Sequence, residues 1–193
     1  MRPDGADMTN CSPGMLALIL LAPVLLAVGC HGAGAYGHSP RYVELDEETT
    51  ATSGAREFDP VMAERQPDQW RQGKVSLFGV VQKREPGPGG QARLTLGVRR
   101  LESRNLCGNE NDDDSCRVTV SDRDFGVVWA LVSLRGDDDV GPQSVGARSL
   151  VRVVGTIGQD VSPTGAPIVH TTYCRHWPAF TYVTRASAGD LRQ

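Results

Sequence analysis

The sequence predicts an all-β domain of five strands and one short helix, beginning near residue 70. Apolar and polar residues alternate with a period of two along several segments, which is typical of half-buried strands. Turn residues separate these segments, as in the Pro- and Gly-rich stretch 85–90. Three strand-like segments precede one helix-like segment, and two more strands follow it. This order predicts a barrel with its helix between the third and fourth strands.

The predicted strands are residues 74–83, 91–101, 117–121, 149–157 and 168–177. In a strand, successive side chains point to opposite faces, so alternate residues share a face. The apolar residues that we expect to point inward from the first two strands are Val75, Leu77, Val81, Leu94, Leu96 and Val98. The strongest strand pattern of the chain is SLVRVVGTI at 149–157.

The single helix is predicted to follow the third strand. Ser121 and Asp124 have the spacing of a capping box, with a hydroxyl at the N-cap and a carboxylate three residues later. The apolar residues that would then lie on one helical face are Phe125, Val128, Trp129 and Val132. We expect this helix to end by Gly136, and we expect Trp129 and Trp177 to be core residues rather than a platform for a ligand.

This order of elements is similar to that of the OB-fold, a five-stranded Greek-key barrel with a helix at one end, between strands three and four. The resemblance covers residues 74–178 and includes Gly79 and Gly155, where strong strand curvature favours glycine. It implies an all-β, five-stranded OB-fold-like barrel with one short helix between strands 3 and 4. A fold of this kind does not specify a function.

The N-terminal region contains an uninterrupted apolar run at 15–28 that is followed by Gly29 and Cys30. The run is too short to span a membrane and has no polar positions at helical spacing, so it is typical of an export signal. Its end, Ala27-Val28-Gly29-Cys30, resembles the lipobox of bacterial lipoproteins. The resemblance implies cleavage before Cys30, a lipid on that cysteine, and attachment to a membrane.

Several further features follow from the lipoprotein resemblance. His31, not Asp, follows the cysteine, which implies the outer membrane and its periplasmic side. The motifs FGVV, LTLGV and VRVVGTI are similar to those of Slp-type outer-membrane lipoproteins, a family that would bring no catalytic residues. The expected organisation is a signal peptide at 1–29, a flexible tether at 30–69, the barrel domain at 70–183 and a tail at 184–193. The tether is expected because 31–69 is Gly-rich and then acidic, without periodicity.

Three cysteines follow Cys30 in the chain, at 107, 116 and 174. Export would place them in an oxidising compartment, where disulfides persist. Cys107 and Cys116 enclose the segment CGNENDDDSC and are the closest pair in sequence, so we expect them to be bonded. Cys174 would then be a free buried thiol or a competitor for one of the other two.

A ligand face is predicted on the outward side of the second and third strands. OB-folds bind oligonucleotides and oligosaccharides on this face. The residues placed there are Arg93, Thr95, Arg99, Arg117 and Thr119. No aromatic side chain lies among them in this assignment, and the formal net charge is −3, so nucleic acid is an unfavourable partner. The two remaining interpretations of this face are a solvent-exposed surface without a ligand and a binding site for an envelope glycan.

Other possible sites have weaker patterns. The acidic runs 109–114 and 137–139 could offer oxygen ligands to calcium but lack EF-hand spacing. The last predicted strand carries His170, Thr172, Cys174 and His176 on one face. Residues 170 and 174 would be ~13 Å apart, so only Cys174 and His176 could act together, as in a Cys/His-dependent hydrolase. We therefore expect no metal, no cofactor and no catalysis, but a binding or accessory module for an unknown envelope protein or glycan.

Overall fold

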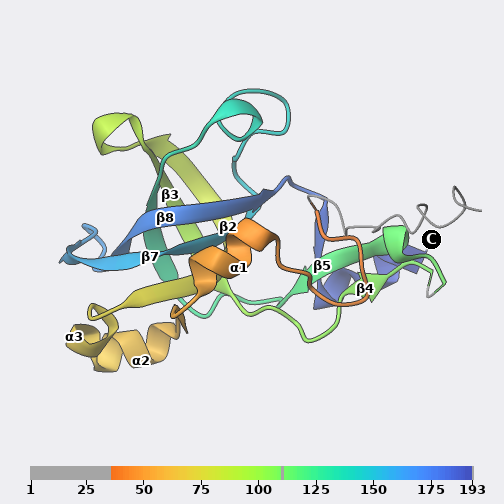
Figure 1. Ribbon diagram of the computed structural model, residues 1–193, viewed down its shortest axis with the longest axis horizontal. Helices are drawn as coiled ribbons and strands as arrows, with labels where there is room; N and C mark the ends of the chain where they lie inside the picture. Colours follow the sequence, from red (N-terminus) through yellow and green to blue (C-terminus); the bar gives the residue numbers. More distant parts are fainter. Residues whose placement is uncertain (1–35, 110, 193) are drawn as a thin grey trace, which may run out of the picture. The chain divides into compact units, whose positions relative to one another are not determined.

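The computed structural model describes residues 36–109 and 111–192, which belong to the unit Ala33–Gln193 (Figure 1). The predicted signal peptide, the lipobox and Cys30 lie outside the described residues. None of the helices in the described part of the chain is long and apolar enough to cross a membrane.

Five strands form a closed barrel in the order β2-β3-β6-β8-β7, and pairing between β2 and β7 closes it. Their bounds are β2 Lys74–Pro86, β3 Ala92–Arg99, β6 Val127–Val132, β7 Leu150–Val161 and β8 Pro167–Trp177. The pair β6–β8 is parallel and the other barrel pairs are antiparallel. The prediction of an all-β, OB-fold-like Greek-key barrel is confirmed.

The alternating pattern of the first two strands fills the barrel interior. The six residues predicted to point inward are at most 2% exposed, and they pack with alternate residues of β6 and β7. Short 3₁₀ turns connect the strands: η1 Pro88–Gly90 joins β2 to β3, and η3 Gly136–Asp138 lies between β6 and β7.

The third barrel strand is not the segment that the sequence suggested. Residues 127–132, predicted to be helical, form β6, with Val128, Ala130 and Val132 pointing into the core. VVWALV fits a period of two as well as a helical face, and its β-branched and aromatic residues favour a strand paired on both sides. The helix prediction is therefore wrong at this position, and only η3 lies between the third and fourth barrel strands.

The segment predicted as the third barrel strand belongs to a second sheet, in the order β4-β5-β9. Its strands are β4 Leu106–Cys107, β5 Cys116–Val120 and β9 Tyr182–Thr184. A second apolar cluster includes residues of β5 and the end of β8 and contains Phe78, Val118, Val120, Leu150 and Trp177. Residues 185–192 of the predicted tail form the 3₁₀ segment η4 Arg185–Arg192.

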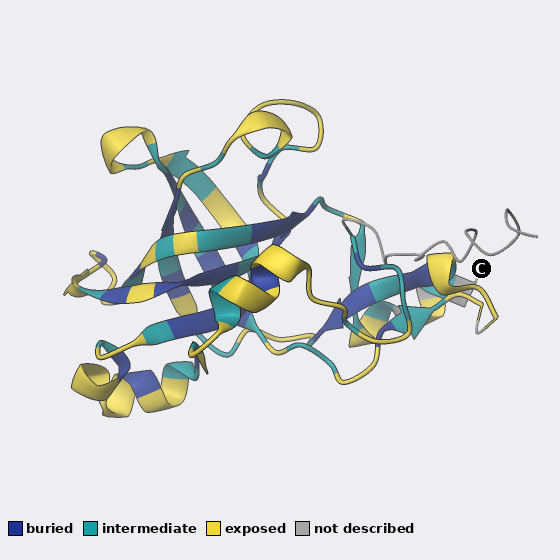
Figure 2. Cartoon of the chain, viewed as in Figure 1, coloured by how far each residue is buried: buried dark blue, intermediate teal, exposed yellow. Residues whose placement is uncertain are grey.

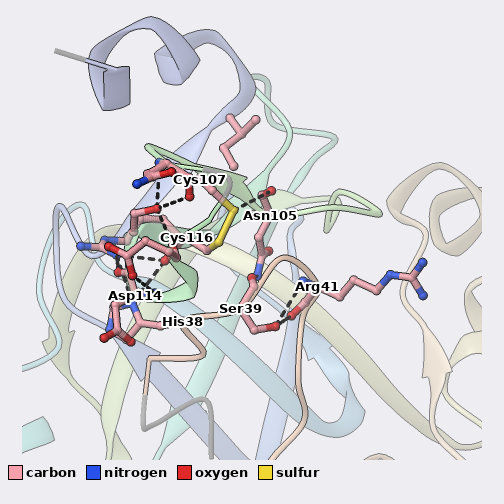
Figure 3. The surroundings of a disulfide bond; sticks show 12 residues. His38, Ser39, Arg41, Asn105, Cys107, Asp114 and Cys116 are labelled. Atoms are coloured by element: carbon pink, nitrogen blue, oxygen red, sulfur yellow. Dashed lines mark hydrogen bonds between the residues drawn. A yellow bond between two sulfur atoms is a disulfide. The ribbon is translucent and has the colours of Figure 1, made fainter. Parts of the chain in front are cut away.

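A disulfide joins β4 to β5. Cys107 and Cys116 are directly opposite in the ladder and are bonded, as expected from the sequence (Figure 3). The loop that they close contains the 3₁₀ turn η2 Asp113–Ser115, capped by the side chain of Asp112. His38 lies against this hairpin, with its Nδ1 3.2 Å from the carbonyl oxygen of Cys116. Cys174 is a free thiol.

Removing this disulfide should destabilise the chain to a moderate extent. For a loop of this length, the chain-entropy model gives about 2.5–3 kcal/mol of free energy of unfolding. We expect that loss in urea unfolding of the double variant Cys107→Ser, Cys116→Ser. The variant Cys174→Ala keeps the disulfide and is the control for cysteine substitution itself. A loss below about 1 kcal/mol in the double variant would contradict the entropic argument.

Residues 36–69, which the sequence predicted as part of a flexible tether at 30–69, contain regular secondary structure; residues 30–35 lie outside the described part of the chain. It contains α1 Asp46–Thr52, β1 Arg56–Glu57, α2 Pro60–Arg65 and α3 Pro67–Trp70. Most of α1 is exposed, but Glu48 is fully buried; Phe58 and Trp70 are buried in the barrel core cluster (Figure 2). The acidic composition of this segment gives no indication of the few residues that anchor it to the barrel. The order of this segment follows from its contacts, not from its mean polarity.

Candidate functional site

A groove of about 970 Å³ lies over the outer surface of β3 and β6. Residues of α2 and α3 and of the β7–β8 hairpin line it, and Figure 1 shows these elements toward the same end of the barrel. The hairpin connects the fourth and fifth barrel strands. The groove therefore occupies the position where OB-folds bind oligonucleotides and oligosaccharides. Its size is within the range of ligand pockets.

Trp129 and Thr95 lie next to each other in this groove. They are paired across the β3–β6 ladder and both line the groove. The Arg93 guanidinium lies 4.6 Å from the centroid of the Trp129 ring, at a distance typical of a cation–π contact. Sequence reasoning missed Trp129 because the helix assignment placed it in the core. The period-two alternative for 127–132 would have placed it outward, beside Thr95.

Exposed apolar side chains surround the groove. Val61, Val127 and Val161 are 48%, 40% and 55% exposed and come from three different elements. Phe58 and Trp70, both nearly buried, also contribute to the wall. Single exposed apolar residues are ordinary, but several around one concave surface make that surface a candidate binding site.

The charged groups of the groove do not favour a polyanion. Its lining includes the carboxylates Glu64, Glu85 and Asp160 and the cations Arg71 and Lys83, and Arg93 lies against the Trp129 ring, so the groove has no excess of positive charge. Hydrogen bonds from Lys83 and then Arg93 lower the pKa of the half-buried Glu85, which is therefore ionised at neutral pH.

The five residues predicted as one ligand face are divided between two sheets. Arg93 and Thr95 are at the groove. Arg99 forms an ion pair with Asp124 at 2.7 Å. Arg117 and Thr119 are on β5, outside the barrel.

These last two residues have structural partners in the second sheet. Arg117 donates to the carbonyl oxygen of Asp114 at 2.6 Å. Thr119 is 1% exposed, and its hydroxyl accepts a hydrogen bond from the Leu106 amide at 2.8 Å. Of the five residues predicted as a ligand face, only Arg93 and Thr95 lie at the groove. Trp129, which was not predicted, lies beside them.

The Cys174 and His176 side chains do not form a nucleophile pair. Burial, with a smaller effect of Asp138, raises the pKa of the Cys174 thiol to about 12, so the thiol is protonated at neutral pH. His176 Nδ1 is 2.9 Å from Asp138 Oδ1, and its Nε2 is 3.1 Å from Ser149 Oγ.

This Asp–His–Ser chain has catalytic connectivity, but its serine is inaccessible. Ser149 is 2% exposed, and its Oγ accepts a hydrogen bond from the Gly146 amide at 3.2 Å. A nucleophile must reach its substrate. These hydrogen bonds instead link the β6–β7 connection to β8.

The two acidic runs also have structural partners. Asp139 forms an ion pair with Arg84, and Asp112 caps η2. Within residues 36–109 and 111–192, no group of three or more His, Cys, Asp or Glu side chains is arranged to hold a metal ion.

Comparison with known proteins adds no family to this description: no family model matches the chain, and no curated protein matches it.

Proposed function

We propose that this chain is a lipid-anchored, exported lipoprotein whose OB-fold-like barrel binds an oligosaccharide of the cell envelope without catalysis. The observation that carries the proposal is the groove over β3 and β6, with Trp129 and Thr95 side by side in it. An indole ring and nearby hydroxyl, amide and carboxylate groups suit a sugar ring, which has apolar faces and a polar edge.

The balance of charge favours a glycan over an oligonucleotide. Nucleic-acid binding needs a positive groove that neutralises phosphates, with aromatic side chains for stacking. The groove has aromatic side chains, but its three carboxylates balance the two lining cations and Arg93, so it is not a positive groove. An oligosaccharide of low charge has no such requirement.

The absence of catalysis is inferred from the state of the candidate reactive groups. Cys174 is a protonated thiol, and Ser149 is buried with its Oγ already hydrogen-bonded. Neither group faces the groove over β3 and β6.

The anchor is proposed from the lipobox and has its own test. Intact mass spectrometry of the membrane fraction should show a chain that begins at Cys30 and carries lipid. The variant Cys30→Ser should lose both lipid labelling and recovery with the outer membrane. A chain that retains residues 1–29 in the soluble fraction would overturn the proposed location.

Replacing Trp129 with alanine should weaken glycan binding strongly. A ligand that covers about 80 Å² of the ring gains about 2 kcal/mol from it, so Kd should rise roughly thirtyfold. The measurement is calorimetric titration with soluble peptidoglycan fragments and lipopolysaccharide core oligosaccharides. Trp129→Phe should restore part of the affinity, because a smaller aromatic ring remains.

The matched control is Phe180→Ala, which removes an exposed aromatic side chain that does not line the groove. This variant should bind glycan as the unmodified chain does. Failure of every glycan, together with salt-dependent binding of oligothymidylate, would replace the proposal with an oligonucleotide-binding function.

A further inference from the structure

The first described residue of the chain is held firmly at one end of the barrel. The Trp177 indole Nε1 donates to the carbonyl oxygen of Tyr36 at 3.0 Å, and the Tyr36 hydroxyl donates to Gln143 at 2.8 Å. Two residues later, His38 contacts the disulfide hairpin (Figure 3). The chain therefore enters the domain beside the end of β8, not through a long free tether.

Two exposed apolar side chains occupy segments that meet at Tyr36. Phe180 is 78% exposed and Val140 is 76% exposed, the highest values for large apolar residues in the described part of the chain. Phe180 is three residues after Trp177, and Val140 is three residues before Gln143. The exposed apolar groups near the chain entry are these two side chains, and Tyr36 and Gln143 also share a small cleft with the carboxylates Glu47, Asp137 and Asp138.

The backbone holds Phe180 in this exposed position at a conformational cost. Phe180 and Arg148 have φ values of 74° and 72°, and no other non-glycine residue among 36–109 and 111–192 has a positive φ. The Arg148 guanidinium lies 4.6 Å from the Phe180 ring centroid. Arg148 is fixed by its amide, which donates to Val81 at 2.7 Å, and by its carbonyl, which accepts from Tyr182 at 3.0 Å. Strained residues of this kind cluster at functional sites, so the strain at Phe180 prompts the question of what the exposed ring contacts.

The length of chain before Tyr36 limits where this surface can lie. Tyr36 is six residues after Cys30, so even a fully extended connection reaches no more than roughly 21 Å. If Cys30 carries the lipid, as the proposed function requires, the end of the barrel that carries Tyr36 must remain close to the bilayer.

We propose that Phe180, with Arg148, is a bilayer-contact site at the level of the lipid headgroups. An aromatic ring beside a cation matches that environment, because the ring enters the interface and the guanidinium meets phosphate. The bilayer is the partner that the short connection places within reach, and the inference rests on the proposed anchor.

This contact also orients the glycan groove. β8 runs from Pro167, which lines the groove, to Trp177, which holds Tyr36. A strand of that length extends about 33 Å. Contact at Phe180 therefore directs the groove away from the anchoring membrane, toward the envelope space.

The test measures membrane depth at two labelled positions of the full lipidated chain. Ala179→Cys, next to Phe180, and Thr164→Cys, in the exposed tip of the β7–β8 hairpin, each receive an environment-sensitive dye. Both variants also carry Cys174→Ala, because Cys174 is a partly exposed free thiol that could otherwise take up dye. Each chain is reconstituted into vesicles of phosphatidylethanolamine and phosphatidylglycerol that contain headgroup spin-labelled lipid.

We expect the dye at 179 to be quenched at least about twofold more than the dye at 164, because interfacial groups lie within ~5–10 Å of the headgroup boundary. Adding Phe180→Ser should remove most of that difference, whereas Val161→Ser, which removes an exposed apolar residue of the groove, should not. A difference that survives Phe180→Ser would come from the short connection alone and would overturn the contact at Phe180. Mass spectrometry of the same samples separates the two hypotheses. Equal quenching at both positions in a lipidated chain overturns the bilayer contact alone, and a chain without lipid overturns the anchor and the contact together.

Discussion

Glu48→Gln is expected to lower the free energy of unfolding by roughly 3–5 kcal/mol, since it removes one partner of a buried ionic network. Glu48 lies on α1 and is 0% exposed. Its carboxylate is 2.8 Å from Arg152 of β7 and 2.7 Å from Arg175 of β8. These contacts hold α1 against the barrel.

The size of this effect comes from what the substitution leaves behind. The side chains of Arg152 and Arg175 are only 12% and 4% exposed, so both cations lie largely out of water. Removing one charge from a buried ionic network leaves the remaining charges less well compensated, and here Arg152 would keep only Glu44 as its carboxylate partner. The Tyr42 hydroxyl, which donates to Glu48, would also lose a charged acceptor.

The same network predicts how stability changes with pH. Burial alone would raise the pKa of Glu48, but hydrogen bonds from the three surrounding side chains outweigh burial and lower it. The folded state therefore binds this proton less readily than the unfolded state. The stabilisation from Glu48 is complete above the unfolded-state pKa, about 4.3, and is lost as pH falls through the lower folded-state value. The difference in free energy of unfolding between the unmodified chain and Glu48→Gln should therefore become smaller as the pH falls through that range.

Glu44→Gln is the matched control, because Glu44 also pairs with Arg152, at 2.7 Å, but is 34% exposed. A pair of that exposure contributes at most about 1 kcal/mol. Urea unfolding of both variants between neutral and acidic pH provides the measurement. Equal losses in the two variants, or a gap that stays constant in acid, would show that burial of Glu48 does not set the effect.

The strand pattern of the sequence determined most of the barrel but not the assignment of its third strand. The period of two in 74–83 and 91–101 identified the inward residues correctly. The apolar residues of these segments fit a strand and do not also fit one face of a helix. The segment 125–132 fits two periods. Whether this segment forms strand β6 or a helix depends on its pairing with β3 and β8, which are distant in sequence.

The candidate site was harder to predict for the same reason. Arg93 and Thr95 were placed correctly on an outward face, but Trp129 required the correct third strand. The anchoring of α1 depends on contacts between Glu48 and strands more than 100 residues later. Local composition around Glu48 is acidic and typical of a disordered segment, and it contains no signal of those partners.

Gly155→Ala should also destabilise the chain severely, by about 3 kcal/mol or more, because the new methyl group would collide with backbone of the neighbouring strand. A Cβ at Gly155 would lie 2.2 Å from the carbonyl oxygen of His170 and 3.0 Å from the Thr171 Cα. These atoms belong to β8, at a shift of register between β7 and β8. Backbone held in a ladder cannot move aside as a flexible side chain can.

Gly73→Ala is the control for the Gly155 substitution. A Cβ at Gly73 would meet nothing within 4 Å, and this exposed position should change stability by no more than about 0.5 kcal/mol. Urea unfolding of both variants gives the comparison. If Gly155→Ala were as stable as Gly73→Ala, β7 and β8 would have to separate freely at this point. The close approach of the two strands there would then contribute little to closing the barrel, and the sequence-based link between Gly155 and strand curvature would fail with it.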